Sequence, residues 1–278
     1  MILWNEHYRH EADVHVSIRD RGYYFGDGVY EVFRIYSGIL FEKGAHLSRL
    51  MRSAEHIRLK LPCAIAELER RLERLVALCG VTDGTLYVQI TRGEAARSHP
   101  FPEAAPVLMA YCSDTASNVV RSVNRGVSAV TVADIRWHRC DIKSLNLLPN
   151  VLAKQEALDR GADEAILHRD GVVTECSAAN VMVVRDGIIY THPANHHILH
   201  GVTRAVALQL ARESVIRVEE RAATLTELAE ADEAFMTGTT VEITPITTID
   251  GRPVGDGTEG PVTAALRRAF NDYAGLSV

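Results

Sequence analysis

The sequence is organised around Arg139-Cys140-Asp141-Ile142-Lys143-Ser144-Leu145-Asn146-Leu147-Leu148-Pro149, in which one lysine stands among apolar residues. An apolar environment disfavours the charged form of an amine and lowers its pKa. A neutral amine can attack a carbonyl carbon, which is the first requirement of Schiff-base chemistry. Lys143 is therefore a candidate Schiff-base lysine. On this stretch alone, a lysine that extends from a strand end into water is the simpler alternative.

The length of 278 residues suits two domains or one large α/β unit. Hydrophobic residues make up 47% and charged residues 24%, which is typical of a soluble globular protein. The net charge of -6, without a basic run, argues against nucleic-acid binding. No apolar segment reaches the roughly 18 residues of a membrane helix, and the N-terminus lacks a signal-peptide pattern. We therefore expect neither nucleic-acid nor membrane partners.

The five cysteines are scattered and have no CxxC spacing. This argues against a disulfide framework or a structural zinc site, and it predicts a location in the reducing cytoplasm. Several histidines lie between residues 192 and 200, but they lack an HExxH pattern and an ordered carboxylate partner. We therefore expect no metal site.

Residues 1–113 are predicted to form an N-terminal α/β domain, followed by a linker at residues 114–122. The hydrophobic pattern predicts strands at residues 14–18, 29–36, 86–90 and 107–111. It predicts helices from about residue 44 and over residues 64–79. Between the first two strands, Gly26 and Gly28 allow a sharp turn or a close approach to another segment.

Residues 123–278 are predicted to form a C-terminal α/β domain. We expect strands at residues 126–132, 164–167, 181–184, 188–191 and 233–236, and a hairpin at residues 243–251. We expect helices at residues 150–160, 203–213 and 261–273.

Two features of this second half favour a charged ligand. Glu175 lies near small residues and two valines, so its carboxylate is predicted to be buried. A buried carboxylate needs a proton or a cation opposite it, and a protonated ring nitrogen would serve. Gly201-Val202-Thr203 is predicted to begin a helix, where free N–H groups and the helix dipole favour an anion.

Two further positions can contact a phosphate. Arg49 can present two donors to one, although a solvated surface arginine is the simpler alternative in isolation. Thr239 follows Gly238 and offers a hydroxyl and an N–H group. With Lys143 and Glu175, these contacts supply the parts needed to hold pyridoxal 5'-phosphate.

Ordered motifs over nearly the whole chain resemble those of the fold-type IV pyridoxal-phosphate-dependent aminotransferases, the family of D-amino acid and branched-chain aminotransferases. The motifs are Asp20-Arg21-Gly22, Phe25-Gly26-Asp27-Gly28-Val29-Tyr30-Glu31, His46-Leu47 with Arg49-Leu50, Asp141-Ile142-Lys143-Ser144, Thr174-Glu175, Gly201-Val202-Thr203-Arg204, and Thr239 with Glu242-Ile243-Thr244-Pro245. The resemblance implies a mixed α+β and α/β fold of two domains, with a pseudo-barrel in the C-terminal domain and the cofactor at the domain interface.

The resemblance also implies roles for individual residues. Lys143 would be the catalytic lysine. The cofactor would be bound by Arg49, Lys143, Glu175, Leu199, Gly201, Val202, Thr203 and Thr239. The substrate would be bound by Tyr30, Val32, Arg97, His99 and Thr240.

Within the family, the loop at residues 91–102 makes the resemblance closest to D-amino acid aminotransferases. Its Arg97 and His99 can act as two cationic donors for a carboxylate, although such loop residues are usually only exposed. In the D-amino acid enzymes, the matching pair reaches across a homodimer and holds the substrate carboxylate together with the tyrosine that matches Tyr30. Branched-chain enzymes lack this clamp and hold the carboxylate near residues that match Thr239 and Thr240.

The predicted reaction is transfer of the amino group from a D-alanine-like amino acid to 2-oxoglutarate, giving pyruvate and D-glutamate. The sequence departs from the D-amino acid enzymes at one place, where Ala178 and Ala179 stand in the positions of serines. This departure bears on the substrate range. The open alternatives are a branched-chain L-amino acid or R-amine transaminase, an aminodeoxychorismate lyase of the same fold, and a cofactor-binding protein without activity.

Overall fold

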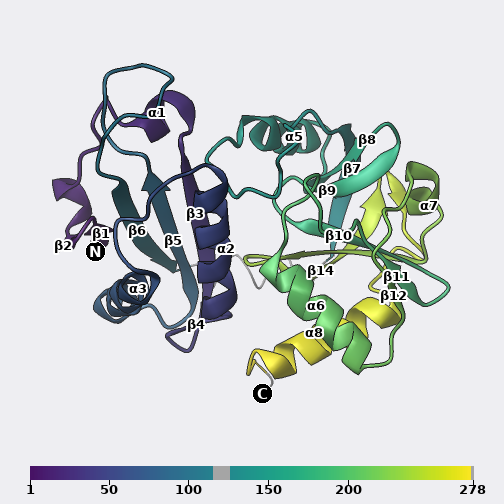
Figure 1. Ribbon diagram of the computed structural model, residues 1–278. Helices are drawn as coiled ribbons and strands as arrows, with labels where there is room; N and C mark the ends of the chain where they lie inside the picture. Colours follow the sequence, from purple (N-terminus) through teal and green to yellow (C-terminus); the bar gives the residue numbers. More distant parts are fainter. Residues whose placement is uncertain (115–125, 277–278) are drawn as a thin grey trace. The chain divides into compact units, whose positions relative to one another are not determined.

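The computed structural model describes residues 1–114 and 126–276 (Figure 1). The chain divides into two compact units. The N-terminal unit comprises Met1–Ala116 and Ile142–Leu147, and the C-terminal unit comprises Ser117–Asp141 and Leu148–Val278. Both units combine a sheet with helices, which confirms the predicted mixed fold class. The predicted linker lies outside the described residues except for Asp114, so its boundaries stay a prediction.

The described part of the N-terminal unit contains a six-stranded antiparallel sheet in the order β2-β1-β6-β5-β3-β4. Its strands are β1 (Ile2–Trp4), β2 (His7–Arg9), β3 (Gly28–Tyr36), β4 (Ile39–Leu40), β5 (Gly84–Thr91) and β6 (Val107–Asp114). Its helices are η1 (Glu11–Asp13), α1 (Arg21–Phe25), α2 (Lys43–His56) and α3 (Ile65–Cys79). The strands and long helices confirm the pattern expected for residues 29–111.

Strand β3 lies between β5 and the edge strand β4, and α2 packs beside it (Figure 1). Alternate residues of a strand face opposite sides of the sheet. Val29, Glu31, Phe33 and Ile35 are all fully buried on one side. The apolar members of that set join a core with leucines from α2 and α3, whereas Tyr30 on the other side is half-buried.

The prediction of a strand at residues 14–18 is wrong. Val16 and Ile18 alternate with polar residues, yet both are exposed, because the segment has no sheet partner. Helix α1 follows and was not predicted from the sequence. Asp20 caps it by accepting a hydrogen bond from the Gly22 amide at 2.7 Å, and Gly26 ends it in the left-handed conformation.

The described part of the C-terminal unit contains a nine-stranded mixed sheet in the order β12-β11-β10-β13-β14-β7-β8-β9, with β15 paired to β14. The strands are β7 (Val127–Ala133), β8 (Glu164–Arg169), β9 (Val172–Cys176), β10 (Asn180–Arg185), β11 (Ile188–Tyr190), β12 (Val218–Glu219), β13 (Glu233–Gly238), β14 (Glu242–Ile249) and β15 (Arg252–Pro253). The helices are α5 (Leu148–Asp159), α6 (Val202–Glu213), α7 (Leu225–Ala229) and α8 (Pro261–Tyr273).

Helices α6 and α8 lie side by side and pack against β13 and β14 (Figure 1). Helix α5 shares a second small core with β7 and β8, in which Ala153 and Ala157 meet Val130 and Leu167. The helix expected over residues 261–273 has those bounds, and the helix expected from residue 150 begins two residues earlier, at Leu148. These elements place Glu175 at the end of β9 and Gly201 directly before α6.

Candidate active site

Lys143 is held by β3 and α2 of the N-terminal unit. Its carbonyl oxygen accepts a hydrogen bond from the Tyr30 amide at 3.1 Å, and its own amide donates to Ser53 Oγ at 3.1 Å. Its Nζ lies 4.3 Å from the centroid of the Tyr30 ring. The apolar neighbours in the sequence do not enclose this amine, because Lys143 is half-buried and Leu147 and Leu148 are exposed. The amine of Lys143 therefore lies near an aromatic ring.

The glycines before β3 are required by the lysine segment. A Cβ on Gly28 would lie 2.7 Å from Leu145 Cδ1 and 2.6 Å from the Ile90 carbonyl oxygen. A Cβ on Gly26, where φ is +63°, would lie 2.7 Å from Asn146 Oδ1. The expected close approach of the glycine-rich stretch is confirmed, and the segment that it approaches is the one that carries Lys143.

Arg49 is buried, which excludes the alternative of a solvated arginine. Its Nε and Nη2 donate to the two carboxylate oxygens of Glu31 at 2.7 and 2.9 Å. His46 Nδ1 lies 2.8 Å from Glu31 Oε2. Burial alone would raise the pKa of Glu31, but Arg49 and His46 outweigh it and hold that pKa at about 2. Glu31 thus fixes the guanidinium of Arg49 in one orientation.

The loop after β5 presents Arg97 and His99, and both side chains are exposed. The guanidinium carbon of Arg97 lies 5.2 Å from the centroid of the Phe25 ring, and the His99 ring centroid lies 5.6 Å from it. Within the described part of this chain, their recorded ring contacts are with Phe25 and not with Tyr30. Tyr30 instead stacks on Tyr87, with the ring centroids 5.6 Å apart.

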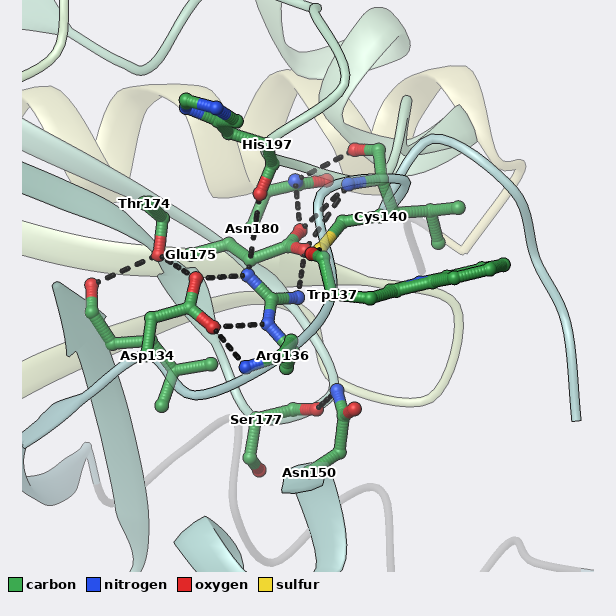
Figure 2. Close-up of polar contacts among 12 residues, drawn as sticks. Asp134, Arg136, Trp137, Cys140, Asn150, Thr174, Glu175, Ser177, Asn180 and His197 are labelled. Carbon is green, nitrogen blue, oxygen red and sulfur yellow. Dashed lines mark hydrogen bonds and ion pairs between the residues drawn. The ribbon is translucent and has the colours of Figure 1, made fainter. Parts of the chain in front are cut away.

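Glu175 is buried, as predicted, and has a cation opposite it. Figure 2 shows the contacts that join it to Arg136 and Asn180. Arg136 Nη1 donates to Glu175 Oε1, and Asn180 Nδ2 donates to Oε2 at 2.9 Å. The Leu199 amide donates to both carboxylate oxygens at 3.1 Å. The cation in this structure is therefore Arg136.

Arg136 is itself held by Asp134, whose carboxylate accepts from Nε and Nη2 at 2.9 Å. Arg169 Nε also donates to Asp134 at 3.0 Å. Burial would raise the pKa of Asp134, but hydrogen bonds from Arg136 outweigh it and hold that pKa at about 2. For Glu175, burial dominates and raises the pKa, although Arg136 opposes this. The ionised form of Glu175 therefore depends on its donors.

The start of α6 is open to an anion. Gly201 is the N-cap residue and supplies no side chain to the free N–H groups of the first turn. A Cβ at this position would lie 2.1 Å from Asn180 Oδ1, so only glycine fits. Val202 and Thr203 follow and are buried. Asn180 thus contacts Glu175, the Leu199 carbonyl oxygen and the Gly201 backbone together.

The turn between β13 and β14 contains Thr239 and Thr240. Thr239 is half-buried and Thr240 is exposed. Nearby on β13, Thr237 pairs with Asn180 of β10, and its buried Oγ1 has no hydrogen-bond partner within the described residues. An unpartnered buried hydroxyl is costly unless a ligand or water satisfies it.

These features fit pyridoxal 5'-phosphate in chemistry. An uncapped helix start suits its phosphate, a buried carboxylate suits its ring nitrogen, and a lysine amine suits its aldehyde. Among the described residues, no group of three or more His, Cys, Asp and Glu side chains is arranged to hold a metal ion. No helix in the described ranges has the length and apolarity to cross a membrane.

The roles of Glu31, Asn180, Ser53 and Arg136 in these networks were not predicted from the sequence. Glu31 did leave a signal, because a carboxylate on the apolar face of a strand requires a buried cation. Asn180 left a weaker signal, as the polar residue that opens an apolar strand. Ser53 is one small residue on a helix, and Arg136 is a loop arginine 39 positions from Glu175, so neither left a signal.

Comparisons with known proteins identify the family of the chain. The family model described as amino-transferase class IV matches residues 28–249. The chain is 48% identical to the D-alanine aminotransferase of Listeria monocytogenes serotype 1/2a (strain 10403S), over 97% of this chain and 94% of that protein. It is 47% identical to the D-alanine aminotransferase of Bacillus licheniformis, over 98% of this chain and 96% of that protein.

A solved structure gives the same result for the fold. The branched-chain amino acid aminotransferase of Escherichia coli has a TM-score of 0.93 and 27% identity, over 99% of this chain and 93% of that one. The matches in sequence and in structure extend over nearly the full length of the chain. The chain therefore belongs to the class IV aminotransferases, the fold-type IV family whose motifs it carries.

Proposed function

We propose that this enzyme transfers the amino group of D-alanine, or of a similar D-amino acid, to 2-oxoglutarate, with pyruvate and D-glutamate as products. The exposed pair Arg97 and His99 on one loop is the observation that carries this choice within the family. Two N–H donors that extend from the same loop can bind one carboxylate. The near full-length similarity to D-alanine aminotransferases supports the same substrate class.

The cofactor is pyridoxal 5'-phosphate, which supplies an aldehyde and an aromatic ring that accepts electrons. Lys143 Nζ would hold the cofactor through that aldehyde. The same amine would be the base that takes the proton from the substrate Cα and the acid that returns it. Its main-chain bonds to Tyr30 and Ser53 hold the lysine in place, which favours a short and repeatable path for the proton.

The remaining cofactor contacts follow from charge. Glu175 would hold a proton on the ring nitrogen, and the Leu199 amide donates to its carboxylate. The N–H groups of the α6 start at Gly201, Val202 and Thr203 would bind the phosphate. Arg49, in the orientation that Glu31 fixes, and Thr239 would supply further donors to it.

The substrate carboxylate is bound by Tyr30 of one subunit together with Arg97 and His99 of a second copy of the chain. The exposure of both loop side chains in the single chain supports this homodimer. Val32, half-buried on the same face of β3 as Tyr30, and Thr240 border the substrate. Ala178 and Ala179 remove hydroxyls near the site, and their effect falls on substrate range. All five cysteines are free, which supports a cytoplasmic location.

The decisive experiment supplies D-alanine or L-leucine separately with 2-oxoglutarate and determines the chirality of the glutamate formed. We expect D-glutamate from D-alanine, and loss of turnover in Lys143→Ala. The similarity to branched-chain aminotransferase structures supports a second candidate, transamination of branched-chain L-amino acids. Turnover of L-leucine without turnover of D-alanine would favour that candidate and refute the first.

A further inference from the structure

We propose that Arg21 is a positioning residue for substrate binding, because it fixes the main chain of the loop that carries Arg97 and His99. This inference rests on the proposed function, in which those two side chains bind the substrate carboxylate. It gives a role to the Asp20-Arg21-Gly22 motif, which has none in the proposed function.

The guanidinium of Arg21 binds three successive carbonyl oxygens of the loop. Nη1 donates to Ser98 at 2.5 Å and lies 3.5 Å from the carbonyl oxygen of Pro100, and Nη2 donates to His99 at 3.3 Å. Ser98, His99 and Pro100 are all exposed, so the loop has little burial of its own to hold it. One buried side chain thus binds the main chain of this exposed segment.

Arg21 is itself rigidly placed. Only 3% of its surface is exposed, its Nε donates to Asp27 at 2.7 Å, and its guanidinium carbon lies 4.9 Å from the centroid of the Phe25 ring. Burial would raise the pKa of Asp27, but hydrogen bonds from Arg92 and Arg21 outweigh it and lower that pKa. Asp27 therefore stays ionised at neutral pH and holds the guanidinium of Arg21 in the orientation that contacts the loop.

The main chain joins the same two segments. The Arg21 amide donates to the Gly93 carbonyl oxygen at 3.0 Å, and the Ala95 amide donates to that of Arg19 at 3.1 Å. Thr91 Oγ1 donates to Asp20 at 2.8 Å. These bonds fix the beginning of the loop, whereas the carbonyl oxygens at residues 98–100 are reached by Arg21.

Phe25 connects this scaffold to the two proposed carboxylate ligands. It lies in α1 with Arg21, and its ring contacts both Arg97 and His99. Loss of the Arg21 fork leaves these side chains present but displaces the backbone from which they extend. Small displacements of a binding group reduce binding strongly, because the bound geometry is no longer pre-organised.

Arg21→Lys tests the inference. Lysine keeps a positive charge near Asp27 but has no planar fork for three carbonyl oxygens. We expect KM for D-alanine and 2-oxoglutarate to rise by between about 10- and 100-fold, with kcat changed by less than about threefold. Cofactor affinity and the absorption spectrum of the holoenzyme should stay as in the wild type. Single-turnover reaction with D-alaninol, which lacks the carboxylate, should also be unchanged.

Arg34→Lys is the matched control. Arg34 is equally buried, and its Nη1 donates to the Gly84 and Ile35 carbonyl oxygens at 2.7 and 3.2 Å and pairs with Asp83, at the end of β3 remote from the loop. We expect its KM values to stay near those of the wild type. If Arg21→Lys does not fold, Asp27→Asn, which loosens the anchor of Arg21, should give the same division between KM and kcat at smaller amplitude.

The variant Arg97→Ala distinguishes a failure of the proposed function from a failure of the inference about Arg21. If it leaves KM unchanged, the carboxylate clamp in the proposed function is refuted. If it raises KM while Arg21→Lys behaves like Arg34→Lys, the clamp stands and the positioning role of Arg21 is refuted. An equal loss of D-alaninol and D-alanine turnover in Arg21→Lys would also refute it, since the defect would then not concern the carboxylate.

Discussion

At the scale of single residues, Arg136 determines the charge state of Glu175. Burial raises the pKa of Glu175, so without donors the carboxyl group would take up a proton at higher pH. Arg136, Asn180 and the Leu199 amide oppose this by stabilising the ionised form. The proposed ability of Glu175 to hold a ring-nitrogen proton therefore depends on these three donors.

We predict that Arg136→Gln moves the acid limb of the kcat profile to higher pH. The folded-state pKa of Glu175 is already raised, and removal of the guanidinium raises it further. The ionised form is then lost at a higher pH as the solution is acidified. At neutral pH we expect kcat to fall by about 10- to 100-fold, as for other supporting contacts of a bound cofactor or metal. Steady-state kinetics from about pH 5.5 to about pH 9 measures the position of the acid limb.

Arg136→Lys serves as the control, because it retains the charge and loses only part of the geometry. Its acid limb should lie between those of the wild type and Arg136→Gln. An acid limb that stays in place in Arg136→Gln would show that Arg136 is only a structural support for Asp134.

The site residues that the sequence could predict are those with a local signature. Lys143 stands alone among apolar residues, Glu175 lies close after two valines, and Gly201 precedes an apolar helix. Arg136 has no such signature, because its contact with Glu175 depends on how β7 and β9 pair through β8. A partner defined by tertiary structure cannot be identified from the residues beside it.

At the scale of elements, β3 and α2 are joined by a buried ion pair between Glu31 and Arg49. Both side chains are almost fully buried, and His46 completes the group. Such a pair contributes little net stability against an apolar substitute, but removing one partner is costly because the other charge stays buried.

We predict that Glu31→Gln destabilises the cofactor-free protein at pH 7 by about 3 kcal/mol through the lost ionic form. The folded-state pKa of Glu31 is about 2, below the ordinary value of 4.5. The pair therefore stabilises fully above that ordinary value and loses its contribution as the pH falls toward 2. Urea unfolding of both proteins at several pH values should show a gap that narrows on acidification.

Glu73→Gln is the matched control, because Glu73 pairs with Lys43 at the surface of the same unit. Surface pairs contribute little, so its stability should match that of the wild type at every pH. A gap for Glu31→Gln that is independent of pH would mean that shape, not charge, joins β3 to α2.

Elements were predictable where the hydrophobic period was sustained. Strand β3 alternates over nine residues and α8 keeps a helical period over thirteen, and both have the expected bounds or nearly so. The failure at residues 14–18 has a physical cause, because alternation creates a strand only where a neighbouring strand is available. Helix α1 has five residues, too few for a period, and it is specified by Asp20 and Gly26 at its ends.

At the scale of the whole molecule, the lysine segment belongs to the N-terminal unit although the sequence on both sides of it belongs to the C-terminal unit. Asn146 donates to the carbonyl oxygen of Gly26, which lies 120 positions away. A contact of such separation has no periodic signal, and only the glycines that permit it are visible in the sequence. The same limit applies to the proposed second copy of the chain, because the residues that it would contribute to the site are exposed in the single chain.

Subunit mixing distinguishes whether Arg97 acts in its own subunit or in a partner. Lys143→Ala lacks the amine, and Arg97→Ala lacks the carboxylate donor. If Arg97 acts across a dimer, a mixed dimer contains one complete site, formed by Lys143 of one subunit and Arg97 of the other. If it acts within its own subunit, neither site is complete.

We predict that co-refolding the two variants in equal amounts restores turnover with the wild-type KM for D-alanine. Random pairing makes half of the dimers mixed, each with one complete site, so the recovered activity should be about a quarter of that of the wild type. The unmixed variants at the same concentration, and Lys143→Ala refolded with itself, should show no such activity. If mass spectrometry demonstrates mixed dimers but the activity is not recovered, Arg97 acts in the site of its own subunit. Because the wild-type KM itself is the readout, a general stabilisation of either variant cannot mimic the result.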